Sequence, residues 1–545
     1  MNYFTTKELF LFPSFTLDVK EQEKLDRFLH LLDKSGIAQI LPIKDSYEKE
    51  KGGRPHYRYC DIFATILYGF AFSSGTLRDL EDCCKYDLRY IYLMNQERPK
   101  HSVFGDFINE VIVPNRKEIF KKLTLAIVEE MQIDTDDCFI DGSKFEADAN
   151  KYKFVWKPTK YHLNLSDKIR TLLKECDLSR AVPDSGIISS ALSAEKVTEL
   201  YQISNDDKTM KKNYDLICSY LIKALEYEEK ERICGENRNS YYKTDHDATA
   251  MTLKQDYYSG LGSNMHAAYN TQLLVSKGLI CSYYISQSRS DINDFIPVVQ
   301  AFHDVFNRYP KRICADSGYG SLSNYRFLKE KGIENYVKFF TFDGNVSGRN
   351  PDCYELYPDH TLTCLNAVKG YPVELQNRHP RKAGSVFYKV DGCAACPFSL
   401  YCKRYMANKE EDYKIFEVQE ELTFFKQHAF DNLLTPKGIE MRINRSSQVE
   451  GAFGVIKQDM DYTRLRRTSM VKAETEFMLT FLGYNIRKLF RHFSGKAKTN
   501  YWVAPTNLNP EKKKKPSARR LANKVSKKKT RSVNETAKKN YKYSS

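Results

Sequence analysis

Two short apolar stretches of this chain each end at an aspartate followed by small residues, and this repeated design limits the fold more than any other feature. The first stretch is Cys138–Ser143, with the sequence CFIDGS, and the second is Ile313–Gly318, with the sequence ICADSG. Apolar, β-prone residues bounded by Gly and Ser are typical of strands that end in turns. The pattern predicts two strands of a sheet, with Asp141 and Asp316 where each strand ends.

A third carboxylate, Glu450, stands in a different setting. The segment Ser446–Lys457 has the sequence SSQVEGAFGVIK. This pattern is typical of a serine-capped helix start and places Glu450 in the first turns of the helix. Because a helix that packs against a sheet can bring a side chain to the strand ends, the sequence predicts that Asp141, Asp316 and Glu450 converge.

Three converging carboxylates indicate hard divalent cations. Cleavage of a phosphodiester without a covalent enzyme intermediate uses two cations about 3.5–4 Å apart, one for the attacking oxygen and one for the leaving oxygen. Mg²⁺ takes one or two carboxylates and fills its other positions with water and phosphate, whereas His or Cys ligands select softer metals. Each acid alone would more often be a turn or surface residue. Together, Asp141, Asp316 and Glu450 predict a catalytic site for two Mg²⁺ (or Mn²⁺) ions.

Longer segments around the three acids resemble a known family. Residues 140–151 (IDGSKFEADANK), 315–320 (ADSGYG) and 449–457 (VEGAFGVIK) resemble the three acidic motifs of DDE transposases from bacterial insertion sequences. The resemblance is to the branch with a Cys-rich segment between the second Asp and the Glu, and it covers residues 54–493. It implies an RNase H-like core, with these three acids as the catalytic residues, Mg²⁺ dependence, and action on the terminal repeats of a mobile element.

Two basic residues near Glu450 are predicted to contact DNA. Lys457 matches the lysine that follows the Glu of the resembled family by seven positions, about two helical turns, so it should share a helix face with Glu450. The family often has a Tyr and an Arg upstream of the Glu. This chain has no suitable Tyr there. Arg445, or alternatively Arg442, is the residue expected to take the role of the family's Arg.

Further positive charge lies downstream. Arg464, Arg466 and Arg467 are also predicted to meet DNA phosphates, although Arg467-Thr468 replaces the usual Arg-Gly pair of the family. Of the net charge of +15, residues 511–545 carry +12. Such a segment cannot bury apolar surface, so it predicts a disordered tail that attracts polyphosphate, with a purely solubilising tail as the alternative.

The chain divides into five segments. Residues 1–132 predict a helical domain, with Ser73–Thr76 as a turn and N-cap between two helices; in the resembled family this region binds DNA. Residues 133–345 predict the first part of the core, with a helical insertion at about 160–237. Residues 346–412 predict a Cys-rich insertion, 413–495 the rest of the core with the Glu-bearing helix, and 496–545 the basic disordered tail.

The order of elements in residues 133–345 predicts the fold class. The strand before Asp141 is expected to form a hairpin with Lys153–Trp156. Ala268–Val275 and Leu279–Ser286 alternate as strands do, and the helix Phe295–Phe306 precedes the strand that ends at Asp316. Three strands, a helix and a further strand are what an RNase H-like mixed sheet requires, so the fold class is α/β.

Other acids and the cysteines need separate interpretation. Asp245 and Asp247 follow no strand, so they predict a loop-ordering or DNA-facing role, and Asp291 and Asp294 predict caps of the helix that follows. Four cysteines have spacings that fit a structural Zn²⁺ site, with unliganded buried thiols as the alternative and Cys353 outside the set. These four are Cys364, Cys393, Cys396 and Cys402.

Composition and resemblance together define the functional hypothesis. No apolar run approaches the ~18–20 residues of a membrane span, and no targeting segment is evident, so we expect a cytoplasmic protein associated with chromosomal DNA. The hypothesis is a transposase that acts on terminal inverted repeats and target DNA as a homodimer or higher oligomer, by Mg²⁺-dependent hydrolysis and strand transfer. The alternatives are an RNase H-like nuclease without strand transfer and an inactive DNA-binding derivative.

Overall fold

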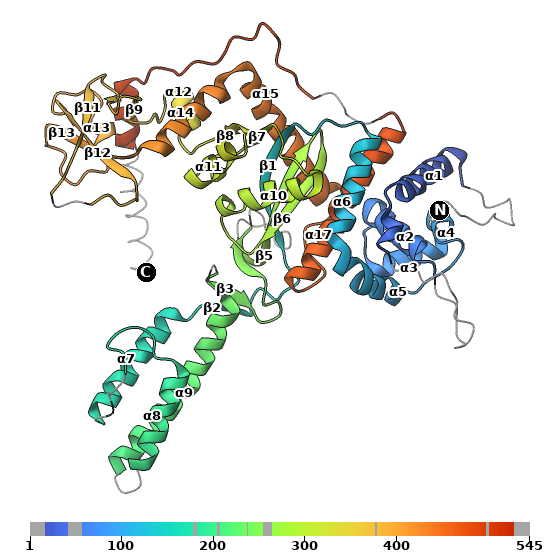
Figure 1. Ribbon diagram of the computed structural model, residues 1–545, viewed down its shortest axis with the longest axis horizontal. Coiled ribbons are helices and arrows are strands. Elements are labelled where there is room, and N and C mark those ends of the chain that lie inside the picture. Colours follow the sequence, from blue (N-terminus) through green and yellow to red (C-terminus); the bar gives the residue numbers. More distant parts are fainter. Residues whose placement is uncertain are drawn as a thin grey trace, which may run out of the picture.

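The computed structural model shows a central mixed sheet from which other units extend (Figure 1). The residues that it describes are 17–41, 57–176, 178, 182–203, 208–236, 238–253, 264–376, 379–496 and 501–527.

The central sheet has the strand order β6-β5-β1-β7-β8. The strands are β1 (Asp137–Glu146), β5 (Met265–Ser276), β6 (Leu279–Ser286), β7 (Arg312–Ala315) and β8 (Glu334–Val337), with β4 (Thr249–Thr252) beside the start of β5. The first three strands along this sheet are antiparallel, whereas β1, β7 and β8 run parallel. This arrangement confirms the RNase H-like mixed sheet.

Side chains of β1 alternate between two apolar cores, as the two-residue period of a strand requires. Cys138 and Ile140 pack with helix α10 (Phe295–Phe306) on one face. Phe139 and Phe145 belong to the larger core on the other face, which includes helix α17 (Met470–Phe493). The sheet is therefore covered on both sides. Asp141 lies in the middle of β1, which continues to Glu146, so the predicted strand end at Asp141 is wrong.

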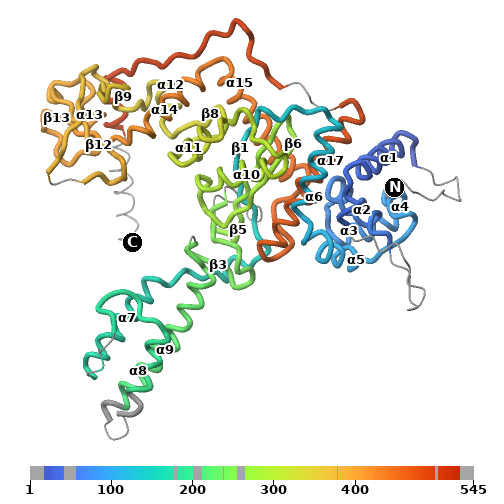
Figure 2. Tube along the Cα trace, viewed as in Figure 1, coloured from blue at the N-terminus to red at the C-terminus, as the bar shows by residue number. Residues whose placement is uncertain are grey.

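The predicted hairpin between the first strand and Lys153–Trp156 is wrong. Strand β2 (Phe154–Trp156) instead pairs antiparallel with β3 (Ser240–Tyr242). The two short strands flank the interval that contains α7 (Thr159–Glu175), α8 (Ser190–Ile203) and α9 (Lys208–Cys234). Pairing across the ends of this helical arm closes it, and the arm projects from the core in Figures 1 and 2.

The N-terminal region is helical, as predicted. It comprises α1 (Val19–Lys34), α2 (Tyr59–Phe72), α3 (Leu77–Tyr86), α4 (Leu88–Leu93), α5 (His101–Phe107) and α6 (Val113–Glu130). The predicted N-cap is confirmed, because Thr76 accepts a hydrogen bond from the Asp79 N–H at 3.1 Å. Helix α17 crosses α2 so closely that a Cβ at Gly483 would lie 2.5 Å from the carbonyl oxygen of Phe70.

Among the described helices, no single one has the length and apolar character to cross a membrane. The bent pair α2 and α3, whose axes meet at 103°, passes the same test only when its two helices are taken together.

A second, smaller sheet contains most of the predicted Cys-rich segment. Its five antiparallel strands run in the order β13-β12-β11-β10-β9 and enclose a small core of their own. The strands are β9 (Tyr354–Leu356), β10 (Leu362–Cys364), β11 (Lys369–Val373), β12 (Ser385–Asp391) and β13 (Tyr413–Gln419). Between β8 and β9 lies α12 (Phe342–Ser347), between β12 and β13 lies α13 (Ser399–Cys402), and α14 (Glu420–Leu434) leads back to the core.

The prediction of a disordered tail is wrong for residues 501–527, which we call the C-terminal strap. The strap runs over the catalytic half of the molecule to the small sheet and ends in a short helix at residues 518–527 (Figure 2). Its contacts are specific: the Trp502 carbonyl accepts from Asn444 at 2.8 Å, and the Ala504 N–H donates to Glu440 at 3.0 Å. Residues 528–545 lie outside the described part.

Candidate active site

Asp141 and Asp316 are neighbours on adjacent parallel strands. Ile140 of β1 lies beside Ala315 of β7, so the next residue of each chain segment is an aspartate at the same level. Adjacent strands are about 4.8 Å apart, and side chains at the same level point to the same face. Gly142 then leaves room for Gln272, since a Cβ at Gly142 would lie 2.5 Å from the Gln272 side-chain oxygen.

Glu450 lies in the interior of a long helix, so the predicted serine-capped start is wrong. We call this helix, which runs through residues 436–459, the catalytic helix; it consists of α15 (Pro436–Arg445), a π turn at Ser446–Glu450, α16 (Gly451–Gly454) and a second π turn at Val455–Asp459. Thr435 caps its N-terminus by accepting from the Gly438 N–H at 3.0 Å. Ser446 already has helical dihedral angles, and its hydroxyl donates to Glu450 at 2.9 Å.

One guanidinium joins the acids. Arg445 contacts the Asp141 carboxylate at 2.8 Å and the Glu450 carboxylate at 3.2 Å. Burial opposes its charge, but the carboxylates of Asp141, Asp316 and Glu450 together raise the pKa of Arg445. All three predicted acids therefore lie around a single positive group. Arg445, predicted to contact DNA, faces these acids in this structure.

The pKa of Asp141 is raised in this setting. Burial is the main cause that raises the pKa of Asp141, and the neighbouring Asp316 carboxylate adds to the increase. Arg445 and the Gly142 N–H, which donates at 2.9 Å, oppose it. Burial and the second carboxylate thus disfavour the ionised form of Asp141, and Arg445 offsets only part of that effect.

The donor chemistry of the site suits a hard divalent cation, since carboxylate oxygens are the ligands that Mg²⁺ and Mn²⁺ prefer. In the part of the chain that the structure describes, no three His, Cys, Asp or Glu side chains are already arranged to hold a metal ion. Arg445 instead lies between Asp141 and Glu450, and it would have to turn away before the acids could close on cations.

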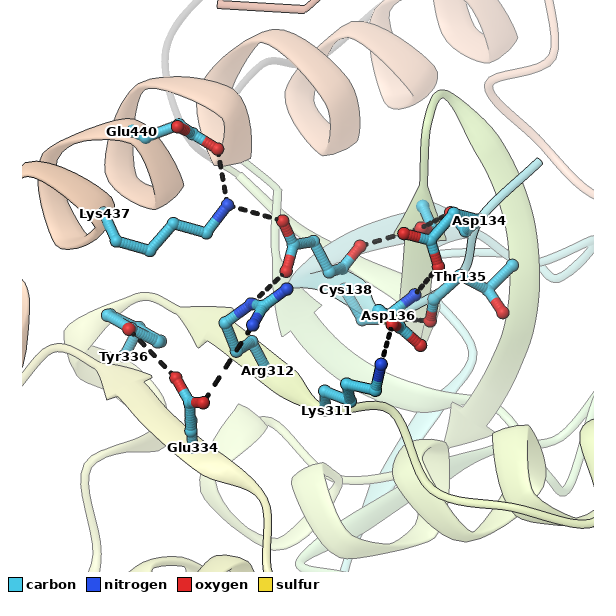
Figure 3. A network of polar contacts seen from close by, with 12 residues as sticks. Asp134, Thr135, Asp136, Cys138, Lys311, Arg312, Glu334, Tyr336, Lys437 and Glu440 are labelled. Carbon is cyan, nitrogen blue, oxygen red and sulfur yellow. Dashed lines mark hydrogen bonds and ion pairs between the residues drawn. The ribbon is translucent and has the colours of Figure 1, made fainter. Parts of the chain in front are cut away.

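A polar network at Asp137, the first residue of β1, fixes the start of the catalytic helix (Figure 3). Lys437 of α15 contacts Asp137 of β1 at 2.7 Å and Glu440 at 2.5 Å, and Arg312 of β7 also binds Asp137. Burial works to raise the pKa of Asp137, but Lys437 and Arg312 outweigh it and lower that pKa. The network ties the helix that carries Glu450 to the strands that carry the two aspartates.

Lys457 lies against β1 beside the site. Its ammonium donates to the Ser143 hydroxyl and to the Lys144 carbonyl, both at 2.8 Å, and sits 4.3 Å from the centre of the Phe145 ring. The predicted contact of Lys457 with DNA remains a prediction, and the structure adds a role in joining the catalytic helix to β1.

The three downstream arginines lie away from the acid cluster. Arg464 contacts Asp148 at 3.1 Å. Arg466 donates to the Ser74 carbonyl at 2.7 Å and Arg467 donates to the Asn109 side chain at 2.9 Å, so both join the core to the N-terminal helices. Burial lowers the pKa of Arg467. These protein contacts were hidden from sequence reasoning because each partner is distant along the chain.

Lys338 is a neighbour of the site that sequence reasoning missed. Val337 of β8 lies beside Ala315 of β7, and the Lys338 N–H donates to the Ala315 carbonyl at 3.1 Å. Lys338 therefore follows its strand at the same level as Asp316. A basic residue directly after the apolar run of β8 was the available signal.

The other acidic pairs have structural contacts. Asp245 accepts from the Tyr269 hydroxyl at 2.8 Å, and Asp247 accepts from the Met470 N–H at 2.8 Å, which fits the loop-ordering interpretation. The predicted capping by Asp294 is wrong, because its side chain makes no cap hydrogen bond. It accepts from the Ser286 hydroxyl at 2.6 Å instead.

The four cysteines proposed for zinc line one small cavity in the second sheet. As stated above, no metal-holding set occurs among the described residues, so zinc has no support from this arrangement. Cys402 instead interacts with Cys353, the cysteine outside the predicted set. Hydrogen bonding from Cys353 and the charge of Lys414, 3.1 Å from the Cys402 sulfur, lower the pKa of Cys402 to about 6 despite burial.

Comparisons with known proteins find that two parts of this chain are similar to transposase domains. The family described as Transposase DDE domain matches residues 363–490, which include Glu450, and the family described as Transposase domain (DUF772) matches residues 14–110. No curated protein and no solved structure matches the chain. The two matches, which together cover less than half of the chain, show that its N-terminal helices and the segment with Glu450 are similar to transposase domains, in agreement with the RNase H-like sheet.

Proposed function

We propose that this chain is the transposase of an insertion sequence, which binds the ends of its mobile element and catalyses hydrolysis and strand transfer. The observation that carries the proposal is that Asp141 and Asp316 lie side by side on β1 and after β7, with Arg445 between Asp141 and Glu450. DNA is the partner that the family implies, with the terminal inverted repeats and the target DNA as the two substrates.

In the proposed mechanism the three carboxylates hold two Mg²⁺ (or Mn²⁺) ions. Bound ions activate the attacking oxygen and stabilise the leaving oxygen of a phosphodiester. Asp141 and Asp316, fixed at one level by the β1–β7 register, would serve both ions, and Glu450 would complete the second site. Arg445, released from the acids, lies at the right place to bind the anionic phosphate. Water cuts the element end first, and the freed 3′-hydroxyl then attacks target DNA.

The proposal also includes the assembly and its place in the cell. Joining two ends of an element to one target needs two active sites, so we infer a homodimer or higher oligomer on DNA. We propose that this assembly acts in the cytoplasm on chromosomal DNA.

Substitution of the acids tests the function. Asp141→Asn and Glu450→Gln, with duplex DNA that carries the ends of the element and Mg²⁺, should each lose cleavage by at least about a hundredfold, since each removes a metal-binding charge. Asp304→Asn is the matched control, because Asp304 is exposed on α10 outside the site. Cleavage retained by either acid variant would contradict the proposal. Cleavage by the unsubstituted chain without joined products would support a nuclease instead.

A further inference from the structure

A basic groove lies next to the far end of the catalytic helix. Its walls come from α1, from the aromatic side of α2, from α4, from the second π turn of the catalytic helix, and from the C-terminal half of α17 with the residues just after it. Six cationic side chains line it, against the acids Glu21 and Asp459. The cations are Lys24, Arg89, Arg487, Lys488, Arg491 and Lys496.

Part of this positive charge is unneutralised. Lys24 pairs with Glu21 at 2.6 Å, and Arg89 pairs with Asp87 at 2.6 Å. Among the described residues, Arg487 and Arg491 have neither an ion pair nor a hydrogen bond to a side chain. They are four residues apart on α17, so their side chains share one helix face. Two neighbouring guanidinium groups that face a groove form a site for anions.

Stabilisation of the helix terminus does not explain the whole cluster. Cations in the last turn of a helix interact favourably with its dipole, and Arg491 lies in the last turn of α17. Arg487 lies a turn earlier, where the dipole effect has largely fallen off. Lys24 and Arg89 come from α1 and α4. Elements distant in sequence thus place cations around one groove. Those of α1 and α4 are paired with acids, whereas within the described part of the chain the neighbouring Arg487 and Arg491 are not, and an anion between these two would relieve their repulsion.

One wall of the groove is formed by the end of the catalytic helix. Val455 and Asp459 line it, and they follow Glu450 by about 8 and 14 Å along the helix axis. A duplex with its cleaved phosphate at the acids could therefore pass into the groove. Lys457, Arg464 and Arg466 are the other basic residues predicted to contact DNA phosphates. In this structure each of them binds a protein group instead.

We propose that this groove binds the phosphodiester backbone of the duplex DNA whose end lies in the active site, with Arg487 and Arg491 as its main phosphate contacts. The inference rests on the proposed function and specifies where the DNA leaves the site. Repeated phosphates along one strand match cations on successive turns of a helix, and such contacts position DNA without reading its sequence.

Salt dependence of binding tests this proposal in the full chain. Fluorescence polarisation with a labelled duplex of the element end, in EDTA, would compare the unsubstituted chain with Arg487→Gln/Arg491→Gln. Two lost phosphate contacts should reduce the slope of log Kd against log salt by about 1.8. The ratio of the Kd of the variant to the Kd of the unsubstituted chain should therefore fall about tenfold between 50 and 200 mM salt. Lys117→Gln/Lys121→Gln on α6 is the control, with the same spacing and charge loss.

The outcomes separate the two proposals. A reduced slope in the groove variant, with the control and both melting temperatures unchanged, supports the groove. If the unsubstituted chain binds and cuts the DNA but the groove variant keeps its slope, or the control loses as much, the groove proposal is wrong while the transposase function stands. If the unsubstituted chain neither binds nor cuts the ends, both are overturned.

Discussion

At the scale of single residues, Asp294 shows how burial controls a charge near the site. Its side chain is 3% exposed, and burial raises the pKa of Asp294 from 3.8 to about 6. The folded chain therefore holds this proton more tightly than the unfolded chain. Its contribution to stability is fully present below about pH 4 and is lost as the pH rises through 6.

Asp294→Asn should remove this loss. The variant is expected to match the unsubstituted chain near pH 4 and to exceed its free energy of unfolding by about 3 kcal/mol at pH 7.5, from a shift of about two pKa units. Urea unfolding at several pH values between 4 and 8 measures the difference. A difference that does not change with pH would show that Asp294 is ionised equally in both states.

The catalytic acids could be predicted from the sequence because their positions depend on local patterns. An apolar run followed by an aspartate marks both positions, and the register of β1 with β7 places Asp141 beside Asp316. The predicted strand end is correct for β7 but wrong for β1, which continues past Asp141 to Glu146. The partners of the basic residues could not be predicted, because they come from remote elements. Arg445 binds Asp141 and Arg467 binds Asn109, and each partner is brought close only by the packing of distant segments.

At the scale of elements, the catalytic helix begins earlier than its sequence suggested. Ser446 and Ser447 resemble a helix start, and Gly451 and Gly454 weaken the helical pattern around Glu450. The true start at Thr435 has a stronger physical basis, because Pro436 needs no hydrogen-bond partner for its nitrogen and the Thr435 side chain satisfies the Gly438 N–H.

Two alanine substitutions distinguish these helix starts. Thr435→Ala removes the cap and should lower the free energy of unfolding by about 1 kcal/mol. Ser446→Ala, the matched control, should change it by less than about 0.5 kcal/mol, because Ser446 is an exposed residue inside the helix. Thermal unfolding of both variants checks the prediction. A larger loss from Ser446→Ala would restore the serine-capped start.

At the scale of the whole molecule, the strap contacts α15 and then reaches the small sheet, although its composition predicts a disordered tail. Its lysines predicted disorder, since local charge excludes a core. The structure places it along α15, where Glu511 contacts Arg442 at 3.1 Å, and beyond, where Leu521 is fully buried. A few anchoring residues thus order a segment whose average composition is that of a disordered one, and a compositional argument cannot detect them.

Two truncations measure what the strap contributes. Ending the chain at Asn500 removes the contacts of Trp502 and Ala504 with α15 and exposes the site of Leu521, whose burial alone is worth about 1.5–3 kcal/mol. We expect a melting temperature lower by several degrees. Because these contacts hold α15, which bears Arg445, cleavage should fall as well. Ending the chain at Lys527 keeps the strap and removes only the basic residues after it, so its melting temperature should not change. Equal stability of both truncated chains would mean that the strap contacts do not hold the catalytic helix in solution.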